Sequence, residues 1–225
     1  MQEAIRETAQ NRLDEITAQM SAAAKLANRA PADVTLIAVS KTRSSDEIAP
    51  LIRAGHRNFG ENRIQEALEK WPELKAMDAG IVLHLIGQLQ SNKAAEAVSL
   101  FDVIHSLDRL SLASALGKAM RDQGRFLPCF LQVNIGAEPQ KGGCAIEALP
   151  ELLAATQAEK IPVAGLMCLP PADIEPAPYF ALLAELSVRY GLDGLSMGMS
   201  GDFQTAIMLG ATHIRVGTAL FGERG

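Results

Sequence analysis

The fold of this protein is decided by the stretch VTLIAVSKT, which occupies residues 34–42. Residues 34–39 are apolar except for Thr35. Such a run, without polar alternation, predicts a strand of a parallel sheet that is covered on both faces. Lys41 comes two residues after this strand. Parallel α/β folds keep their ligands at the carboxyl ends of the strands, so we expect the Lys41 amine at a ligand-binding mouth.

From this strand onward the chain alternates short apolar runs with helical patterns. Strands are expected at 34–39, 57–59, 81–86, 103–105, 129–133, 163–167, 194–197 and 213–216. Helices are expected at 3–29, 45–54, after 62 as far as 70, from 91, after an Asp108 cap as far as 120, at 146–158, at 176–189, from about 202, and in a short turn at 218–221.

Eight strand–helix units predict a (β/α)₈ TIM barrel with an extra N-terminal helix. A doubly wound open sheet is the competing architecture. The even number of strands and the lack of a second apolar domain favour the barrel. We therefore expect residues 1–225 to form one domain, with the helix of residues 1–30 packed on it.

Composition narrows the classes of function. The 225 residues carry a formal charge of −5, with no cluster of Lys or Arg, which argues against nucleic-acid or membrane-surface binding. No apolar run reaches the length of a membrane span, and the N-terminal residues do not resemble a signal peptide. The three cysteines lack zinc spacing and are expected to be reduced thiols. We expect a monomeric cytoplasmic protein.

Polar residues or glycine follow most of the expected strands, and this pattern indicates a site at one end of the barrel. These residues are Lys41, Asn62, Gln88, Ser106, Asn134, Ser200 and Gly217. The loop at 136–143 contains three glycines and follows the fifth strand, so it either closes over a ligand or is an ordinary exposed loop.

Two stretches near the C-terminus predict a phosphate cradle. Residues 196–201 read SMGMSG and residues 215–218 read RVGT. In barrels, the loops after the last two strands frequently bind phosphate through glycine N–H groups and hydroxyls. Arg215 should point into the barrel mouth, toward a salt-bridge partner or a ligand ring nitrogen.

The combination of a lysine and a phosphate cradle predicts a phosphorylated aldehyde as the ligand, because lysine amines form Schiff bases with aldehydes. A sugar phosphate and pyridoxal 5′-phosphate (PLP) both meet this description.

Several blocks of the sequence resemble the pyridoxal phosphate homeostasis protein family. They are AVSKT at 38–42, FGEN at 59–62, HLIGQLQSNK at 84–93, QVNI at 132–135, GLM at 165–167, LSMGMS at 195–200 and RVGTALFG at 215–222. The resemblance implies a barrel similar to the N-terminal domain of alanine racemase, with PLP held as a Schiff base on Lys41. It implies that Ser200, Gly217 and Thr218 hold the phosphate, that Arg215 faces the pyridine nitrogen, and that Asn62 and His84 lie beside the ring.

The residues predicted to bind the cofactor are therefore Lys41, Asn62, His84, Ser196, Met199, Ser200, Arg215, Gly217 and Thr218. The resemblance also implies a role in PLP homeostasis and cofactor supply, with PLP-dependent apoenzymes as transient partners, rather than catalysis. No catalytic residue and no metal ligand is predicted.

A PLP-dependent amino-acid racemase is the alternative function, and a Schiff-base aldolase without cofactor is a second rival. Racemisation requires two bases, one on each face of the substrate α-carbon. Lys41 supplies one. The only tyrosines, Tyr179 and Tyr190, fall in and after the helix that follows the sixth strand, so neither is expected to supply the other.

Overall fold

The computed structural model describes residues 2–222, with side chains from residue 8 onward, and its eight parallel strands form a closed barrel. The strands lie side by side in chain order, and β8 pairs with β1 to close the sheet. The barrel predicted from the sequence is confirmed, and the open sheet is wrong. The strands are β1 (Thr35–Val39), β2 (Asn58–Glu61), β3 (Val82–Leu85), β4 (Val103–Leu107), β5 (Cys129–Val133), β6 (Val163–Cys168), β7 (Gly194–Ser196) and β8 (His213–Val216).

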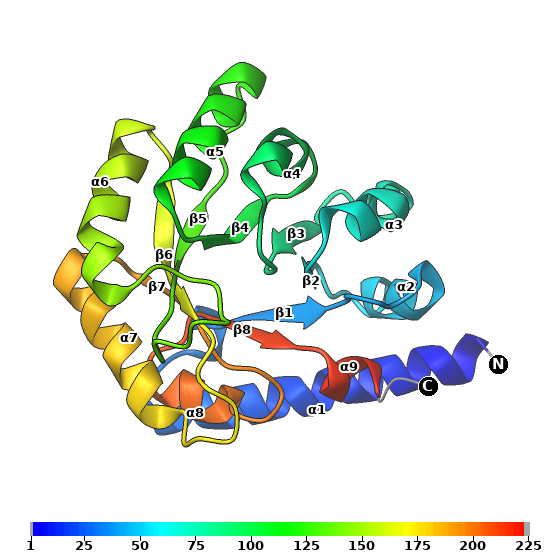
Figure 1. Cartoon of the computed structure of the whole chain (residues 1–225). Coiled ribbons are helices and arrows are strands. Elements are labelled where there is room, and N and C mark those ends of the chain that lie inside the picture. The colour runs from blue at the N-terminus through cyan, green and yellow to red at the C-terminus, as the bar shows by residue number, and fades with distance from the viewer. Residues whose placement is uncertain (1, 223–225) are drawn as a thin grey trace.

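Helices surround the barrel, as Figure 1 shows. They are α1 (Gln2–Leu26), α2 (Ser45–Arg53), α3 (Ile64–Met77), α4 (Ala94–Leu100), α5 (Leu110–Gln123), α6 (Leu149–Ala158), α7 (Ala177–Tyr190), α8 (Phe203–Met208) and α9 (Thr218–Phe221), with 3₁₀ turns at Pro31–Asp33, Ser91–Lys93 and Ile146–Ala148. The long α1 packs against α2, α8 and α9, and its residues Ile16, Met20 and Ala24 are buried there. Each outer helix thus covers the apolar outer face of the strands beside it.

Several helix ends differ from the sequence prediction, and two of them have a clear cause. The first helix ends at Leu26, because Asn28 turns left-handed (φ 54°) and Arg29 N–H bonds to the carbonyl of Ala24. The third helix continues past Lys70 to Met77 although it contains Pro72. Full burial of Trp71 and near-full burial of Leu74 offset the hydrogen bond that proline removes.

The cap predicted at Asp108 is also wrong. The N-cap of α5 is Arg109, and no side chain caps this helix. The Asp108 carboxylate instead accepts from Arg109 Nη1 at 2.7 Å and from the N–H of Gly143 at 3.3 Å. It therefore fastens the loop after β5 rather than the helix.

The interior of the barrel contains aromatic and imidazole rings as well as aliphatic side chains. The rings of His105 and Phe130 stack with centroids 4.4 Å apart, and His213 meets Phe130 edge-on at 4.9 Å. The ring centroids of His84 and His105 lie 5.2 Å apart.

Within residues 2–222, no helix has the length and apolar character needed to span a membrane.

Candidate functional site

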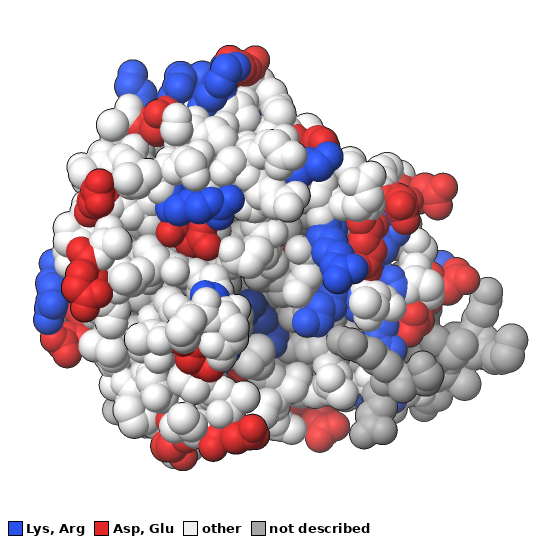
Figure 2. Space-filling view, viewed as in Figure 1, with Lys and Arg blue, Asp and Glu red and all other residues white. Residues whose placement is uncertain are grey.

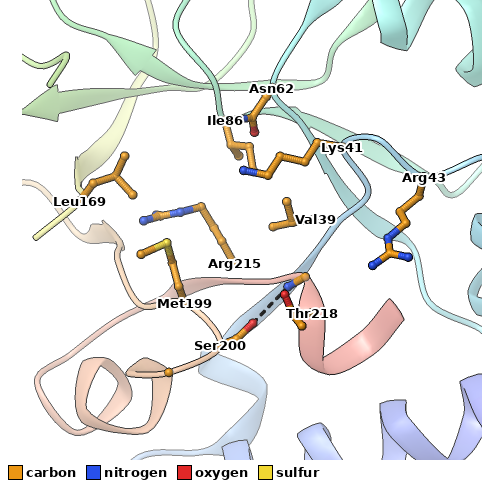
Figure 3. A pocket seen from close by; sticks show the side chains of 12 residues that line it. Val39, Lys41, Arg43, Asn62, Ile86, Leu169, Met199, Ser200, Arg215 and Thr218 are labelled. Carbon is orange, nitrogen blue, oxygen red and sulfur yellow. Dashed lines mark hydrogen bonds between the residues drawn. The ribbon is translucent and has the colours of Figure 1, made fainter. Parts of the chain in front are cut away.

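A cavity of about 410 Å³ opens at the carboxyl ends of the strands, and its walls come from β1, β2, β7 and β8 with one residue each after β3 and β6. Its size is typical of a small-molecule site. Its walls are shown in Figure 3. The lining residues are Val39, Lys41, Arg43, Asn62, Ile86, Leu169, Met199, Ser200, Gly201, Arg215, Gly217 and Thr218.

Lys41 extends from the turn after β1 into this cavity (Figure 3). The residue is half-buried. Within the described part of the chain its amine makes no hydrogen bond and no ion pair. An amine without a carboxylate partner is available to an electrophile or an anion inside the cavity.

Barrel closure brings the C-terminal cradle beside Lys41. Ala38 of β1 is in register with Val216 of β8, so Gly217 follows directly alongside Val39. A Cβ on Gly217 would stand only 3.4 Å from the Val39 carbonyl oxygen. Lys41 and the cradle therefore come from adjacent strand ends, although they are far apart in sequence.

The cradle itself is built from Ser200, Gly217 and Thr218. Gly217 N–H points to Ser200 Oγ at 3.4 Å, and Thr218 begins the short helix α9 (Figure 3). The loop carrying Ser200 depends on Gly198, whose φ of 95° is left-handed and whose added Cβ would stand 2.6 Å from that of Ala206. Hydroxyls and a backbone N–H that converge on one space suit a phosphate.

Arg215 is buried in the barrel mouth, with 4% of its surface exposed. Its Nη1 donates to Ser196 Oγ at 2.6 Å and its Nη2 donates to the carbonyl of Cys168 at 2.9 Å. Burial lowers the pKa of the guanidinium, but arginine remains protonated in proteins. Among residues 8–222, no carboxylate lies within 4 Å of it. In this part of the chain, the buried positive charge thus has no carboxylate in direct contact, and Asp202 acts on it only from a greater distance.

A chain of hydrogen bonds runs from Arg215 through the barrel interior. Ser196 Oγ lies 2.9 Å from His105 Nδ1, His105 Nε2 lies 3.0 Å from His84 Nδ1, and His84 Nε2 lies 3.1 Å from Asn58 Oδ1. The amide oxygen of Asn58 only accepts, so His84 Nε2 carries a proton and the Nδ1 of a neutral His84 accepts from His105 Nε2. His105 Nδ1 then accepts from the hydroxyl of Ser196. Both imidazoles then carry their proton on Nε2, and the chain ends on the amide oxygen of Asn58.

This direction requires neutral histidines, and burial keeps them neutral. Burial lowers the pKa of His84 to about 3, and the charges of His213 and His56 act in the same direction. Burial also lowers the pKa of His105 well below its ordinary value. Arg215, at the end that faces the cavity, is therefore the only charged residue in this series of hydrogen bonds.

Asn62 enters the cavity from the residue after β2 (Figure 3). The backbone of Asn62 lies so close to Gly87, which follows β3, that position 87 has no room for a side chain. A Cβ on Gly87 would stand 2.2 Å from the Asn62 carbonyl oxygen and 2.6 Å from its Cα. Gly87 therefore lets the chain after β3 press against the backbone of Asn62.

Seven of the nine residues predicted to bind a cofactor line the cavity: Lys41, Asn62, Met199, Ser200, Arg215, Gly217 and Thr218. The other two, His84 and Ser196, lie deeper. Ser196 meets Arg215 and His105, and His84 meets His105 and Asn58. The structure thus places both residues behind Arg215 and not at the wall of the cavity.

Three polar strand ends predicted to share the site do not reach the cavity. Gln88 donates to Gln132 at 2.6 Å, and Asn134 donates to the carbonyl of Glu138 at 2.8 Å. Ser106 is fully buried. The loop at 136–143 covers this half of the mouth. It is held there by Asn134 and by Gln132, the partner of Gln88, which donates to the carbonyl of Gly142 at 3.1 Å.

Four lining residues were not predicted to belong to the site: Val39, Arg43, Ile86 and Leu169. Gly201 also lines the cavity; it belongs to the predicted cradle stretch 196–201 but was not among the nine residues predicted to bind the cofactor. Arg43 follows Lys41 by two residues, and this proximity is the one signal that pointed to it. It is paired with Glu47 at 2.9 Å and also lies over the ring of Phe221. Val39, Ile86 and Leu169 are apolar residues at strand ends, where nothing in the pattern distinguishes cavity wall from core.

The cavity is electropositive in an acidic protein. Its wall contains Lys41, Arg43 and Arg215 and no Asp or Glu. Figure 2 shows Lys and Arg side chains inside the central hollow of the face seen there. No cluster of residues suited to a metal ion occurs within the described chain. These charges favour a small organic anion.

Comparison with known proteins places these features in a family. Residues 12–225 match the family model described as alanine racemase, N-terminal domain. A pyridoxal phosphate homeostasis protein of Pseudomonas aeruginosa is 43% identical over 215 residues, covering 93% of each chain. The protein of the same name from Escherichia coli K12 is 36% identical and covers 94% of this chain and 95% of its own length.

Solved structures agree with this assignment. PipY of Synechococcus elongatus, solved with PLP bound, is 39% identical, with a TM-score of 0.80 over 95% of this chain and 100% of its own. An alanine racemase of Clostridium difficile is 15% identical, with a TM-score of 0.66 over 85% of this chain and 53% of its own, and it shares the fold alone. The protein described here belongs to the alanine racemase N-terminal domain family and, within it, to the pyridoxal phosphate homeostasis proteins.

Proposed function

We propose that this protein binds PLP in the cavity at the barrel mouth and acts in PLP homeostasis and cofactor supply rather than in catalysis. One observation carries the proposal. Two cations that contact no carboxylate among the described side chains, Lys41 and Arg215, share a cavity with the donors Ser200, Gly217 and Thr218. A ligand with an aldehyde, an acceptor atom and a phosphate satisfies all of these groups.

Different residues bind different parts of this ligand. Lys41 is the attachment point for the aldehyde. Ser200, Gly217 and Thr218 bind the phosphate, and Arg215 donates to the ring nitrogen. When bound, PLP supplies an electrophilic carbon and an electron-withdrawing ring. A permanently charged donor at the ring nitrogen keeps that nitrogen unprotonated, which weakens the electron sink that carbanion chemistry requires.

The cavity wall also favours binding over racemisation. Lys41 is the one lining side chain that can serve as a base, because arginine does not release its proton. Tyr179 and Tyr190 lie in α7, packed against the apolar core, and neither lines the cavity. A second base on the opposite face of a substrate is therefore missing from the described wall.

Further features of this function are proposed on the same basis. We infer one domain over residues 1–225, a monomer, a cytoplasmic location, and transient contact with PLP-dependent apoenzymes that receive the cofactor. Size-exclusion chromatography with light scattering tests the monomer. Transfer of PLP to an apoenzyme, followed by recovery of that enzyme's activity, tests the delivery.

Absorbance spectra combined with mass spectrometry test the binding. Purified protein mixed with PLP should develop a band near the visible edge, which borohydride should abolish while adding one reduced cofactor to the chain. Peptide mapping should place that mass on Lys41. A chain that takes up no cofactor, or takes it up on another lysine, would contradict the proposal. Production of D-amino acids that stops in Lys41→Ala would favour the racemase instead.

A further inference from the structure

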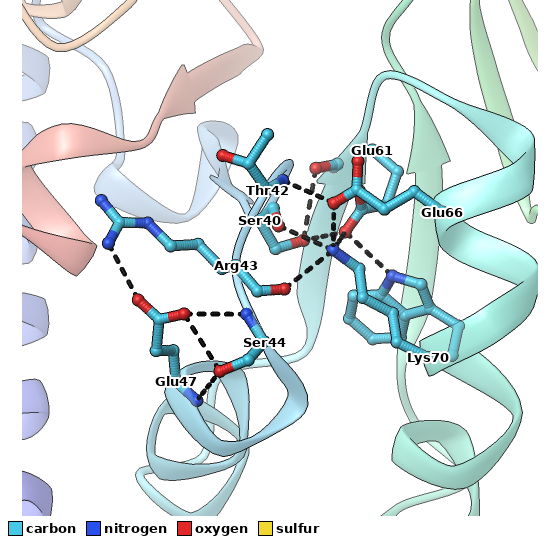
Figure 4. A network of polar contacts seen from close by, with 10 residues as sticks. Ser40, Thr42, Arg43, Ser44, Glu47, Glu61, Glu66 and Lys70 are labelled. Atoms are coloured by element: carbon cyan, nitrogen blue, oxygen red, sulfur yellow. Dashed lines mark hydrogen bonds and ion pairs between the residues drawn. The ribbon is translucent and has the colours of Figure 1, made fainter. Parts of the chain in front are cut away.

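A second lysine, Lys70 of α3, is buried next to the turn that carries Lys41 (Figure 4). Its Nζ donates to two backbone carbonyls of this turn, that of Ser40 at 2.9 Å and that of Arg43 at 3.1 Å. It also meets Glu61 Oε1 at 2.9 Å and Glu66 Oε1 at 2.7 Å. Four oxygen atoms thus surround one ammonium group, and two of them flank Lys41 in the chain.

The two carboxylates reach the same turn directly. Glu61 Oε1 accepts from the hydroxyl of Ser40 at 2.6 Å and from the indole N–H of Trp71 at 3.0 Å. Glu66 Oε1 accepts from the backbone N–H of Thr42 at 2.5 Å. Ser40, Thr42 and Arg43 are therefore all bonded to α3 or to the end of β2. Lys41 is the one residue of the turn 40–43 that this network leaves free.

The backbone of the turn requires such support. Thr42 has a φ of 61°, in the left-handed region that β-branched residues avoid. The chain continues from this turn into α2, and the side chain of Lys41 points into the cavity (Figure 3). Strained conformations persist only where the surrounding contacts hold them, and the contacts here are those of Lys70 and Glu66.

We propose that Lys70 is a positioning residue for Lys41, acting with Glu61 and Glu66 to hold the turn 40–43 so that the Lys41 amine faces the cavity. The inference deepens the proposed function and rests on it. The same network distinguishes the two lysines chemically. Lys70 has four acceptors and is nearly inaccessible, whereas Lys41 has none and is half-buried at the cavity wall.

A purely structural role for Lys70 would be to neutralise the buried Glu61. That carboxylate is fully buried, and burial raises its pKa. Its Oε2 has no hydrogen-bond partner among the residues that the structure describes. Removal of Lys70 alone would leave this carboxylate unpaired, so a loss of stability in Lys70→Met would not separate the two roles. The test therefore includes the double variant Glu61→Gln/Lys70→Met, which removes both charges and keeps an amide in contact with Trp71 and Ser40.

The experiment measures the rate at which added PLP is fixed on Lys41 by borohydride, together with the melting temperature of each variant. In folded Lys70→Met and in the double variant, the rate should fall about tenfold or more. Lys75→Met is the matched control, because Lys75 lies on the same helix but bonds to Asp102 and Leu100, away from the turn. Its rate should stay within about twofold of the wild type.

Glu66 provides an independent comparison. Glu66→Gln keeps an acceptor for the N–H of Thr42 and should load PLP nearly as fast as the wild type, whereas Glu66→Ala should load more slowly. Equal rates for these two variants, or a folded double variant that loads like the wild type, would overturn the inference. A wild-type protein that takes up no PLP would instead overturn the proposed function.

Reductive methylation with formaldehyde supplies a readout without PLP. In the wild type, peptide mapping should find Lys41 modified well before Lys70. In Glu66→Ala, whose turn has lost a contact, the rate at Lys41 should change while that at Lys75 stays constant. An unchanged rate at Lys41 would count against a positioning role.

Discussion

Arg215 donates through Nη1 to Ser196 Oγ at 2.6 Å, and both side chains are buried in the barrel mouth. The hydroxyl of Ser196 in turn donates a hydrogen bond to His105 Nδ1. The cation at the floor of the cavity is thus oriented by a neutral hydrogen-bonded chain and not by a carboxylate. No carboxylate in contact neutralises this charge within residues 8–222, so it can act on an acceptor group in the cavity.

Ser196→Ala should therefore affect both stability and binding. It leaves Arg215 Nη1 and His105 Nδ1 without a partner, which should lower the free energy of unfolding by about 1–3 kcal/mol. Urea titration measures this change, and PLP titration should show weaker binding. Ser99→Ala, on the exposed surface, is the control and should be close to neutral. A fully stable Ser196→Ala that binds PLP normally would contradict the role of the chain.

Lys41→Ala should abolish the covalent attachment of PLP and leave the fold intact. Because Lys41 has no partner within the described chain, its loss should change the free energy of unfolding by no more than about 0.5 kcal/mol. Circular dichroism melting checks the fold, and borohydride reduction with mass spectrometry checks the attachment. Retention of covalent PLP would identify another lysine, such as Lys93 or Lys141, as the attachment point.

Arg215→Gln should weaken PLP binding and shift the absorbance band of the bound cofactor. The amide keeps a donor for Ser196 but removes the charge that opposes protonation of the ring nitrogen. Arg215→Lys retains the charge without the planar fork, so its spectrum should lie nearer to that of the wild type. Spectra recorded over a pH series make the comparison. An unchanged spectrum in Arg215→Gln would argue against a ring-facing position.

Stability should fall as the pH is lowered from about 6.5 toward 4. Burial lowers the pKa of His56 and of His213 to about 4 and that of His84 to about 3, below the ordinary value of 6.5. In this pH window these histidines are protonated in the unfolded chain but stay neutral in the folded chain. Each such histidine then contributes a slope of about 1.4 kcal/mol per pH unit.

Glu61 opposes this trend at the acidic end, because its raised pKa lets the folded chain take up a proton first. Denaturant titrations at pH 7.5, 6.5, 5.5 and 4.5 measure the balance. Equal stability at pH 6.5 and pH 5.5 would contradict a net uptake of protons by the unfolded chain in this window.

Gly87→Ala should destabilise the protein by about 1–3 kcal/mol and disturb Asn62. The new Cβ would meet the Asn62 backbone at 2.2–2.8 Å, and backbone atoms cannot move aside without displacing a strand end. Gly201→Ala is the matched control, because nothing lies within 4 Å of its added Cβ. Thermal melting of both variants makes the test. A Gly87→Ala protein as stable as Gly201→Ala would contradict the close approach.

The pattern of residues was sufficient to predict the barrel and half of its mouth. Buried parallel strands carry a continuous apolar signal, and Lys41, Gly217 and Thr218 stand directly after such strands. These features depend on local order along the chain. Gln88 and Asn134 stand at equivalent positions, yet they bind the loop at 136–143, because the sequence pattern contains no information about which loop folds over which strand ends.

By itself, the sequence determined the strand count, the position of Lys41 at a strand end and the glycine-rich cradle. Only the tertiary structure decided which side of the mouth is open, that His84 and Ser196 stand behind Arg215, and that Lys70 supports the turn of Lys41. The physical reason is that a closed sheet joins β1 to β8 and buries polar groups from distant segments together. Each buried group must find its partner in space, and periodicity along the chain does not specify that partner.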